Sequence, residues 1–407
     1  MIRLKIVCLL LLGGVSFQLS TSLQAEDWYR WRGPNLNGIS SEKNWMAKWP
    51  SQGPKQLWKA NVGIGFSSMS VSDGRVYTMG NENNMDTVFC FNAETGEKIW
   101  KHSYACPLDP KYYEGGPSIT PTVDGKTVFT MSRRGELFCF NTDDGKVIWS
   151  KNLARELGAE IPMWGFASSP LVENNLLILN VGSAGTALDK ITGKVVWNSG
   201  KSAAGYSSAV RADFDGQRCA VLFEAKSVLA VAIKDGKKVW RHEWKTSYDV
   251  NAAEPIIVGD KVFITAGYDH GCALLQVKNG KATVLWENKN LKNHFNSSIY
   301  LDGFLYGFDG NAGPKADFNC VDFKTGQVKW SQDKLGAGAL MVADGKLIVL
   351  ADKGELMIAE ASPAAFKPIS RAQVLGGRNW TAPVLSNGRI YCRNAKGDLV
   401  CLDVKGK

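Results

Sequence analysis

The chain has 407 residues, of which 48 are Lys or Arg and 39 are Asp or Glu, so its formal net charge is +9 at pH 7. Many lysines follow a turn glycine by one position, namely Lys126, Lys146, Lys194, Lys237 and Lys346. They are therefore spread along the chain, whereas nucleic-acid binding needs basic residues gathered on a single face. We interpret the positive charge as a solvated rim in preference to a polyanion site, and weak attraction to an anionic membrane surface stays open.

The first residues have the order of a secretory signal peptide. Arg3 and Lys5 precede the apolar run Ile6–Phe17, and Leu23-Gln24-Ala25 offers a cleavage site. The apolar run is too short to cross a bilayer as a helix. Cys8 lies inside this run, too early to be a lipid-anchor cysteine at the cleavage point. The sequence therefore predicts an exported protein, periplasmic or secreted, that does not span the membrane.

Downstream of this segment the chain repeats one phrase. Residues 89–102 read FCFNAETGEKIWKH, and residues 138–151 read FCFNTDDGKVIWSK. Related phrases end at further tryptophans, and the spacing from one tryptophan to the next lies between 42 and 49 residues, through Trp58, Trp100, Trp149, Trp197, Trp240, Trp286 and Trp330. A period of this length indicates stacked supersecondary units.

Each unit contains four short segments rich in β-branched and aromatic residues, separated by turns. In the first unit the segments are SSMSVS, RVYTMG, DTVFCFN and EKIWKH. Asn-Gly and Asp-Gly pairs suit tight hairpins, because such turns need a positive φ. The first turn of the unit occurs eight times, at Asp73-Gly74, Asp124-Gly125, Asn174-Asn175, Asp215-Gly216, Gly259-Asp260, Asp302-Gly303, Asp344-Gly345 and Asn387-Gly388. The sequence therefore predicts an all-β fold, an eight-bladed β-propeller of four-stranded antiparallel blades.

The two ends of the chain complement each other. Residues 380–405 supply three strands and stop before a tryptophan strand, whereas KQLWKA at 55–60 is a tryptophan strand without the other three. We expect this N-terminal strand to pair with the three C-terminal strands and close the ring. Because the lead segment lies outside the repeats, we expect residues 26–44 to be dispensable and Trp45 to add little stability. The predicted organisation is a signal peptide (1–25), a lead segment (26–54) and a single propeller domain (55–407).

The repeated phrase resembles a known motif. ALDKITGKVVW, which ends at Trp197, is similar to the pattern Ala-x-Asp-x-x-Thr-Gly-x-x-x-Trp of the tryptophan-docking repeat in pyrroloquinoline-quinone (PQQ) propellers. The similarity covers almost all of the mature chain, and DWYRWRGPNLNGIS at 27–40 resembles the start of a group of exported bacterial proteins with such repeats. The family includes quinoprotein alcohol dehydrogenases and the non-enzymatic outer-membrane assembly factor BamB. The resemblance implies the fold and leaves the function open.

Two residue types that suggest chemistry are interpreted as structural. The tryptophans share the period of the blades, so each is expected to pack against the neighbouring blade. Cys90, Cys139, Cys320 and Cys401 occupy one small-residue position of the repeat. Equivalent positions in adjacent blades lie about 10 Å apart, too far for a disulfide, so these four are predicted to be buried and free. The four histidines show no metal-ligand spacing.

Up-and-down strand order gives the ring two different ends. The tight turns share one end, which we call the turn end, and the second-to-third loops and inter-blade connections share the other, which we call the mouth. The connections are aromatic and each leads into an innermost strand, so they should crowd the mouth, where aromatic walls with a few polar groups are typical of a ligand pocket. The alternative is that they only fill the wide channel. The predicted ligand-binding residues are Phe66, Tyr113, Trp164, Phe166, Tyr206, Tyr248, Asp249, Asn251, His294, Phe295, Arg378 and Trp380.

Three functional interpretations stay open, and no catalytic residue is assigned. We favour a binding or scaffold protein of the cell envelope, without cofactor or metal, that presents the mouth to a protein, peptide or glycan. The second is a dehydrogenase dependent on PQQ and Ca²⁺ that oxidises an alcohol or sugar. Hard oxygen ligands are available for it in Glu114, Asp249, Asn251 and Glu254. However, the chain lacks the adjacent Cys-Cys pair of the classical enzymes and is shorter than they are. The third is a structural subunit without a small ligand.

Overall fold

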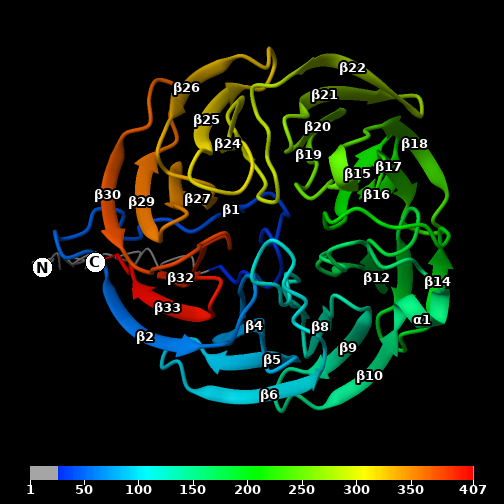
Figure 1. The fold of residues 1–407 in the computed structure, drawn as a ribbon, viewed down its shortest axis with the longest axis horizontal. Helices are drawn as coiled ribbons and strands as arrows, with labels where there is room; N and C mark the ends of the chain where they lie inside the picture. The colour runs from blue at the N-terminus through cyan, green and yellow to red at the C-terminus, as the bar shows by residue number, and fades with distance from the viewer. Residues whose placement is uncertain (1–25, 407) are drawn as a thin grey trace, which may run out of the picture.

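The computed structural model describes residues 26–406, and the predicted signal peptide and Lys407 lie outside this part of the chain. The strands form eight sheets arranged as a ring, which confirms the predicted eight-bladed β-propeller (Figure 1). Seven sheets have four strands, and one has a fifth. Besides the strands there are two short helices, α1 (Leu153–Leu157) and η1 (Ser247–Asp249). Within residues 26–406 no helix has the length and apolar character needed to cross a membrane.

Each blade runs from an innermost to an outermost strand, and the blades are numbered here in chain order. Blades 1 to 4 consist of β3 (Ser70–Ser72), β4 (Arg75–Glu82), β5 (Met85–Asn92) and β6 (Lys98–Ala105); β7 (Thr122–Asp124), β8 (Thr127–Met131), β9 (Glu136–Asn141) and β10 (Val147–Asn152); β11 (Leu171–Glu173), β12 (Leu176–Leu179), β13 (Thr186–Asp189) and β14 (Val195–Asn198); β15 (Val210–Phe214), β16 (Gln217–Glu224), β17 (Ser227–Ala232) and β18 (Lys238–Glu243).

The second half of the ring repeats this arrangement. Blades 5 to 8 consist of β19 (Ile256–Val258), β20 (Lys261–Ala266), β21 (Gly271–Lys278) and β22 (Lys281–Asn288); β23 (Ile299–Leu301), β24 (Phe304–Asp309), β25 (Asp317–Asp322) and β26 (Val328–Gln332); β27 (Ala339–Ala343), β28 (Lys346–Leu350), β29 (Glu355–Glu360) and β30 (Pro368–Gln373); β31 (Val384–Ser386), β32 (Arg389–Arg393), β33 (Asp398–Asp403) and β2 (Lys55–Asn61).

The ring closes as predicted. β2 pairs antiparallel with β33, so that one N-terminal strand completes a sheet of three C-terminal strands. Trp58 of β2 lies opposite Cys401 of β33. The same pairing of a tryptophan with a small residue recurs in other blades, for example Trp100 with Cys90 and Trp149 with Cys139. All eight cysteines of the described chain are buried and free, which confirms the expectation for the four repeat cysteines.

The periodic tryptophans join neighbouring blades. The Trp100 indole Nε1–H donates to the carbonyl oxygen of Thr142 in blade 2 at 2.8 Å, and a Cβ added to Gly145 would lie 2.6 Å from the ring. Only glycine therefore leaves room for the indole at this turn. Trp58, Trp149, Trp197 and Trp286 make the same two contacts with the next blade, at Gly96, Gly193, Gly236 and Gly326. The repeat phrase thus encodes both halves of these five interfaces.

The interface between blades 4 and 5 departs from this rule. Trp240 of blade 4 is buried, but within residues 26–406 its indole Nε1 has no hydrogen-bond partner. The facing turn of blade 5 is a two-residue Asn279-Gly280 hairpin instead of the four-residue Thr-Gly type, and a Cβ on Gly280 would meet only the Val239 carbonyl at 3.4 Å. The looser repeat in blade 5 therefore removes the glycine platform, and Trp240 packs edge-on against Phe214 instead.

The lead segment occupies the centre of the ring. Its backbone carbonyls accept hydrogen bonds from innermost strands, since Trp28 O accepts from Val71 N–H at 2.9 Å and Tyr29 O from Val123 N–H at 2.8 Å. β1 (Ile39–Ser40) then adds a parallel fifth strand inside β27. These contacts lie near the ends of the innermost strands, so the segment closes the channel from the turn end.

We call the part of the lead segment inside the channel (residues 26–44) the plug. Its side chains add further contacts with the blades. Trp31 Nε1–H donates to Glu254 at 2.7 Å, Arg32 donates to the Ser298 carbonyl at 2.9 Å, and buried Glu42 accepts from Gly388 N–H at 3.0 Å. Trp45 is also buried, in the core cluster that surrounds Trp58. The expectation that residues 26–44 are dispensable and that Trp45 adds little does not agree with this placement, because both belong to the packed interior.

Candidate functional site

At the mouth, the inter-blade connections are tied to one another by their backbones. The N–H groups of Phe66 and Ser67 both donate to the carbonyl of Pro117, at 2.8 and 3.0 Å, and the N–H of Tyr206 donates to the carbonyl of Asn251 at 2.9 Å. Each connection therefore fixes the next one, and the aromatic residues they carry are held around the open end of the channel.

A chain of ring contacts crosses the mouth. The ring centroid of Phe66 lies 5.6 Å from that of Tyr113 and 5.4 Å from that of Trp380. Phe295 follows at 4.4 Å from Trp380, and His294 at 5.1 Å from Phe295. Five of the predicted residues, from four different connections, thus form one half-buried aromatic surface.

Tyr268 continues this surface, and sequence reasoning missed it. Its ring lies 4.7 Å from His294 and 5.3 Å from Tyr248. Tyr268 belongs to the loop between β20 and β21, a second-to-third loop, whereas the prediction considered only the inter-blade connections. The second-to-third loops share the mouth with the inter-blade connections. The tyrosine in GYDHG at 267–271 was therefore the sequence signal from which Tyr268 could have been predicted.

Tyr206 is another aromatic residue of the mouth. Its ring packs edge-on against Trp164 at 6.0 Å. Burial, together with the nearby Asp249, Tyr113 and Tyr268, raises the pKa of the Tyr206 phenol to about 12. Phenol groups from two connections and one loop therefore lie close to one another at the mouth.

One ion pair of the mouth joins Arg378 to Glu114. Arg378 donates to Glu114 at 2.6 Å, and its guanidinium lies 4.3 Å from the ring centroid of Trp380. The Trp380 Nε1–H in turn donates to Asp352 at 3.0 Å. Arg378 thus stacks on the aromatic surface as a cation–π partner, and Trp380 is held in one orientation.

Two of the predicted ligand-binding residues point away from the mouth into the core, and a third, His294, lies at the mouth without a charge. Phe166 is buried in the core between blades 2 and 3. Asn251 is fully buried, and its amide donates to three carbonyls, including that of Trp244 at 3.3 Å. The His294 Nδ1 accepts from the Ala312 N–H, and burial lowers the pKa of its imidazole to about 4. His294 is therefore an uncharged member of the aromatic surface at neutral pH.

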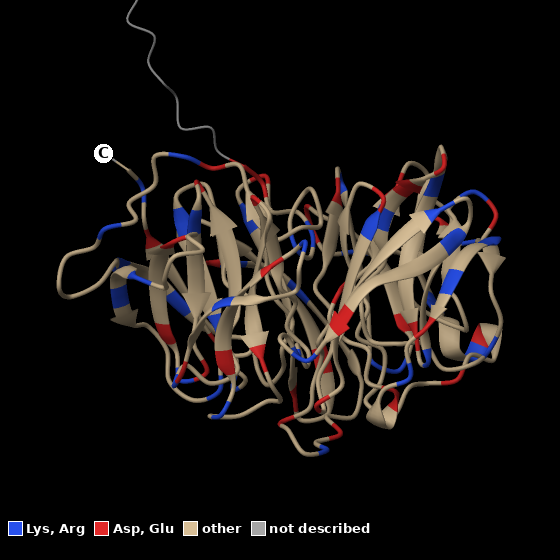
Figure 2. Cartoon of the chain, turned by 90° about the horizontal axis from the view of Figure 1, so that it is seen from above, with Lys and Arg blue, Asp and Glu red and all other residues tan. Residues whose placement is uncertain are grey.

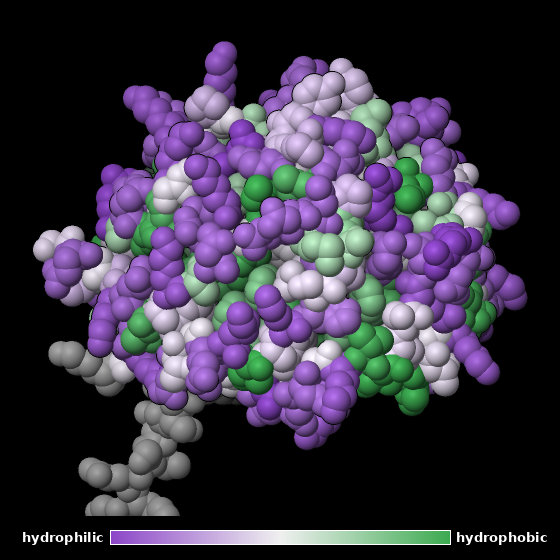
Figure 3. All heavy atoms as spheres, turned by 60° about the horizontal axis from the view of Figure 1, so that its bottom comes forward, coloured by the Kyte–Doolittle hydropathy of each residue, from purple (hydrophilic) through white to green (hydrophobic). Residues whose placement is uncertain are grey.

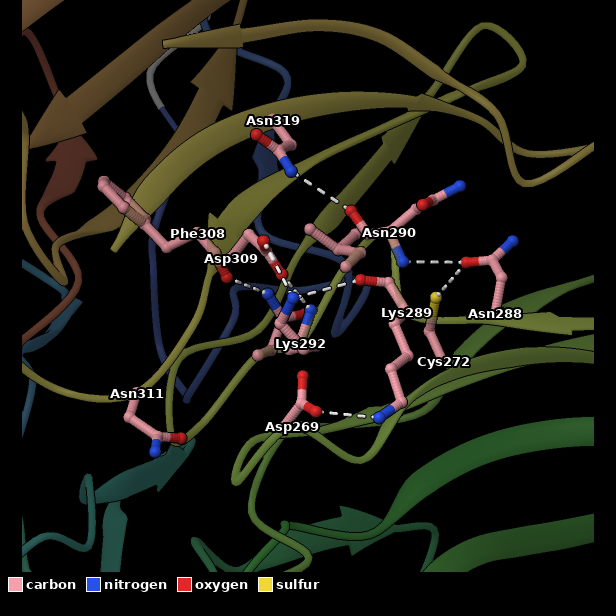
Figure 4. A network of polar contacts seen from close by, with 12 residues as sticks. Asp269, Cys272, Asn288, Lys289, Asn290, Lys292, Phe308, Asp309, Asn311 and Asn319 are labelled. Atoms are coloured by element: carbon pink, nitrogen blue, oxygen red, sulfur yellow. Dashed lines mark hydrogen bonds and ion pairs between the residues drawn. The ribbon is translucent and has the colours of Figure 1, made fainter. Parts of the chain in front are cut away.

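A polar network supports the wall that carries Tyr268 and His294 (Figure 4). The Asn311 side chain accepts from the Tyr268 N–H at 2.6 Å, and Lys289 pairs with Asp269 at 2.7 Å. Lys292, next to His294, donates its backbone N–H to Asp309 at 2.7 Å. These bonds tie the β20–β21 loop to blade 6.

Aromatic and apolar side chains also project outward around the mouth. Tyr112 is 98% exposed, Tyr248 is 65% exposed and Met163 is 58% exposed. Tyr112, Tyr248 and Tyr268 have φ values of 65°, 61° and 54°, in the left-handed region that bulky residues rarely adopt. Such backbone strain gathers at binding and switching sites. The exposed rings and the strain coincide on the loops of the mouth.

The cavity between the plug and the aromatic surface is small. A cavity of about 30 Å³ remains between the plug, with Trp28, Trp31 and Arg32, and the rings of Phe295 and Trp380. This volume holds about one or two water molecules, whereas pockets for drug-sized ligands measure roughly 300–1,000 Å³.

The quinone implied by the fold family does not fit these residues. The cavity has no room for it, and the Glu254 carboxylate already accepts from Trp31 and from the Ser297 hydroxyl. Glu114 is paired with Arg378, and Asn251 is turned into the core. Among residues 26–406 no group of three or more His, Cys, Asp or Glu side chains is placed to hold a metal ion. The four oxygen ligands suggested by the sequence are therefore dispersed.

The loop that carries Tyr112 and Tyr113 rests on a buried carboxylate. Asn81 Nδ2 donates to Asp86 at 2.6 Å and to the Cys106 carbonyl, where this loop begins, at 2.9 Å. Asp86 is fully buried, and burial raises its pKa to about 6. Within residues 26–406, Asp86 Oδ2, Asn81 Oδ1 and the Tyr104 hydroxyl have no hydrogen-bond partner.

This carboxylate makes a pH-dependent contribution to stability. Between pH 4 and 6 the folded state binds the Asp86 proton more tightly than the unfolded state, so stability falls as pH rises through this window. Asp86→Asn keeps the acceptor for Asn81 and adds N–H donors for the unpaired oxygens. We expect it to raise the unfolding free energy at pH 7.5 by roughly 2–3 kcal/mol and to change it little at pH 4. Chemical denaturation of both proteins at the two pH values measures this, and an equal effect at both would contradict it.

The comparisons with known proteins agree with this architecture. The family model described as outer membrane protein assembly factor BamB matches residues 84–332 and 314–407. BamB from Moraxella catarrhalis has a similar structure, with a TM-score of 0.61 and 15% identity over 86% of this chain and 99% of that one. Quinohemoprotein alcohol dehydrogenase from Comamonas testosteroni has a TM-score of 0.68 and 13% identity over 94% of this chain and 81% of that one. At these identities the two structures show a shared fold alone. No curated protein sequence matches the chain.

Proposed function

The chain belongs to the PQQ-like β-propeller family of the outer membrane protein assembly factor BamB, and we propose on this premise that it is a binding or scaffold protein of the bacterial cell envelope. Its partner is a protein or peptide that docks on the aromatic mouth. The periplasm is the proposed compartment, since the first residues have the order of a signal peptide.

The composition and shape of the mouth carry this proposal. Tyrosine, tryptophan and arginine dominate the residues that contribute most to protein–protein affinity, and they gather at the mouth as Tyr112, Tyr248, Trp380 and Arg378. The surface is shallow, because the plug leaves a cavity of only about 30 Å³ beneath it. A shallow aromatic surface offers a small molecule little burial, whereas a macromolecule can cover all of it.

Photo-crosslinking in the native envelope tests the proposal. A photoreactive amino acid at position 248, which is 65% exposed at the mouth, is expected to give discrete crosslinks to a partner protein. The control is position 191, where Ile191 is 67% exposed at the turn end. Adding Trp380→Ala and Tyr112→Ala should weaken the crosslinks at position 248 at least tenfold, because alanine at such central residues costs about 2 kcal/mol or more. Equal crosslinking from both positions, or no effect of the alanines, would refute the proposal.

The dehydrogenase alternative has its own test. Titration of the purified protein with PQQ and Ca²⁺ is expected to give no shift in thermal stability. A ligand that binds only the folded state, at a hundred times its dissociation constant, would stabilise the protein by about 2.7 kcal/mol. Saturable binding together with dye-linked alcohol oxidation would favour the enzyme and require the plug to move away from Glu254.

A further inference from the structure

The outer rim of the ring is asymmetric in charge. In blades 4, 5 and 6, the third-to-fourth turns with the first residues of the outer strands (233–239, 278–285 and 323–329) contain seven lysines and one acid, Asp235. The equivalent residues of blades 1 and 2 (93–99 and 142–148) contain two lysines and four acids. Sequence reasoning treated the lysines as spread evenly, but the ring gathers these seven on one arc.

The arc is continuous in space. The outer strands β18, β22 and β26 follow one another along the rim in Figure 1. Figure 2 views the ring from this side and shows Lys and Arg segments, interspersed with Asp and Glu segments, at the end at which the C-terminus lies, which is the turn end. The seven lysines are all exposed: Lys234, Lys237, Lys238, Lys278, Lys281, Lys324 and Lys329. Within residues 26–406 only Lys237 among them forms an ion pair, with Asp235 at 3.2 Å.

Acidic groups near the arc are engaged elsewhere. Asp260 pairs with Lys261 at 2.8 Å, and Asp215 accepts the Gly280 N–H at 3.0 Å. The Asp322 carboxylate caps its own turn by accepting from the N–H and hydroxyl of Thr325. Asp215 and Asp322 keep their negative charge, but with Asp235 they are three acids against seven lysines, so the arc presents a net positive surface.

Exposed aliphatic side chains stand between these lysines. Val284 and Leu285 on β22 are 39% and 46% exposed, and Val328 on β26 is 40% exposed. Aliphatic residues at this position are a property of the repeat, since Ile99 and Ile148 of blades 1 and 2 are also exposed; Figure 3 brings that side of the ring forward and shows hydrophobic patches on it. Blade 3, next to blade 4, carries Lys194 beside exposed Val195 and Val196 and has no acid at the equivalent residues 190–196, whereas blades 1 and 2 carry four acids there.

We propose that this rim, defined by the seven lysines with Val284, Leu285 and Val328, docks on an anionic lipid bilayer. Lysines near such a surface are attracted by its negative potential, and aliphatic side chains enter the interface beside them. A soluble polyanion would use the lysines but gain little from the aliphatic groups. Because the rim lies at the turn end of the outer strands, docking there leaves the mouth free for its own partner. The proposal does not depend on the function of the mouth.

Vesicle sedimentation tests the proposal. The protein without residues 1–25 is expected to bind vesicles rich in phosphatidylglycerol, with an affinity that falls as the salt concentration rises. It is not expected to bind vesicles of pure phosphatidylcholine. The quadruple variant Lys234→Gln, Lys238→Gln, Lys278→Gln, Lys281→Gln should bind at least about tenfold more weakly. The matched control removes the same charge from blades 1 and 2, with Lys98→Gln, Lys101→Gln, Lys126→Gln and Lys146→Gln, and should bind like the unmodified protein. Equal losses in both variants would overturn the proposal.

A second variant separates a bilayer from a polyanion. Val284→Ser with Leu285→Ser is expected to weaken vesicle binding several-fold and to leave binding to soluble heparin unchanged, with thermal unfolding as the check that the ring is intact. If this variant binds vesicles as well as the unmodified protein does, the rim is a general polyanion surface and the proposal fails.

Discussion

Deleting residues 26–44 is expected to convert the folded ring into an unstable or aggregating protein, with a loss of more than about 5 kcal/mol of unfolding free energy. A single large-to-small change in a core costs about 3–5 kcal/mol, and this deletion removes buried Trp28 together with Arg30, Arg32 and Glu42. It also leaves the Glu254 carboxylate without its Trp31 donor. The size-exclusion profile and the thermal unfolding of residues 45–407 measure the effect.

A milder variant separates the plug from general truncation. Trp31→Phe keeps an aromatic ring in the channel and removes only the 2.7 Å bond to buried Glu254, so we expect a loss of about 1–3 kcal/mol. Residues 45–407 could instead remain monomeric, with an unfolding temperature within a few degrees of that of residues 26–407. In that case the plug does not stabilise the ring, and the interpretation of the mouth as a shallow surface must also change.

Trp100→Ala is expected to destabilise the protein by about 3–5 kcal/mol, as large aromatic-to-alanine changes in cores do. The indole fills the interface between blades 1 and 2, where it contacts Tyr77 and Phe140 and donates to the Thr142 carbonyl. Trp100→Phe should recover part of the loss, because it restores the ring without the N–H. Equilibrium unfolding in denaturant gives both values.

The contribution of the glycine on the other side of this interface is tested with a matched pair of substitutions. Gly145→Ala places a methyl group 2.6 Å from the Trp100 ring, whereas Gly280→Ala, at a nearly equal φ of 69°, meets nothing closer than 3.4 Å. Both substitutions carry the cost of a left-handed residue, about 1–2 kcal/mol, so the difference between them isolates the docking contact. We expect Gly145→Ala to be the more damaging by at least 1 kcal/mol. Equal losses would show that the glycine platform adds nothing.

The sequence by itself determined the ring. The tryptophan period, the eight tight turns and the complementary chain ends specify blades and closure, because each is a local pattern that repeats at a fixed spacing. The Thr-Gly turn and the tryptophan of one phrase even predict the interface between neighbouring blades. Half of the mouth was predictable for the same reason, since strand order dictates which loops share an end.

Only the tertiary structure decided what fills the centre and what faces out. The lead segment has no period, and its partners lie as far away as Ser386, 360 residues from Glu26, so no local pattern could place it. Whether an aromatic residue reaches the mouth depends on the direction of its side chain, which sends Phe166 into the core and Tyr268 to the surface. The seven lysines are dispersed in the sequence and become one arc because the ring places blades 4, 5 and 6 side by side. Long-range contacts and side-chain direction are set by packing of the whole ring, and the pattern of residues along the chain does not contain them.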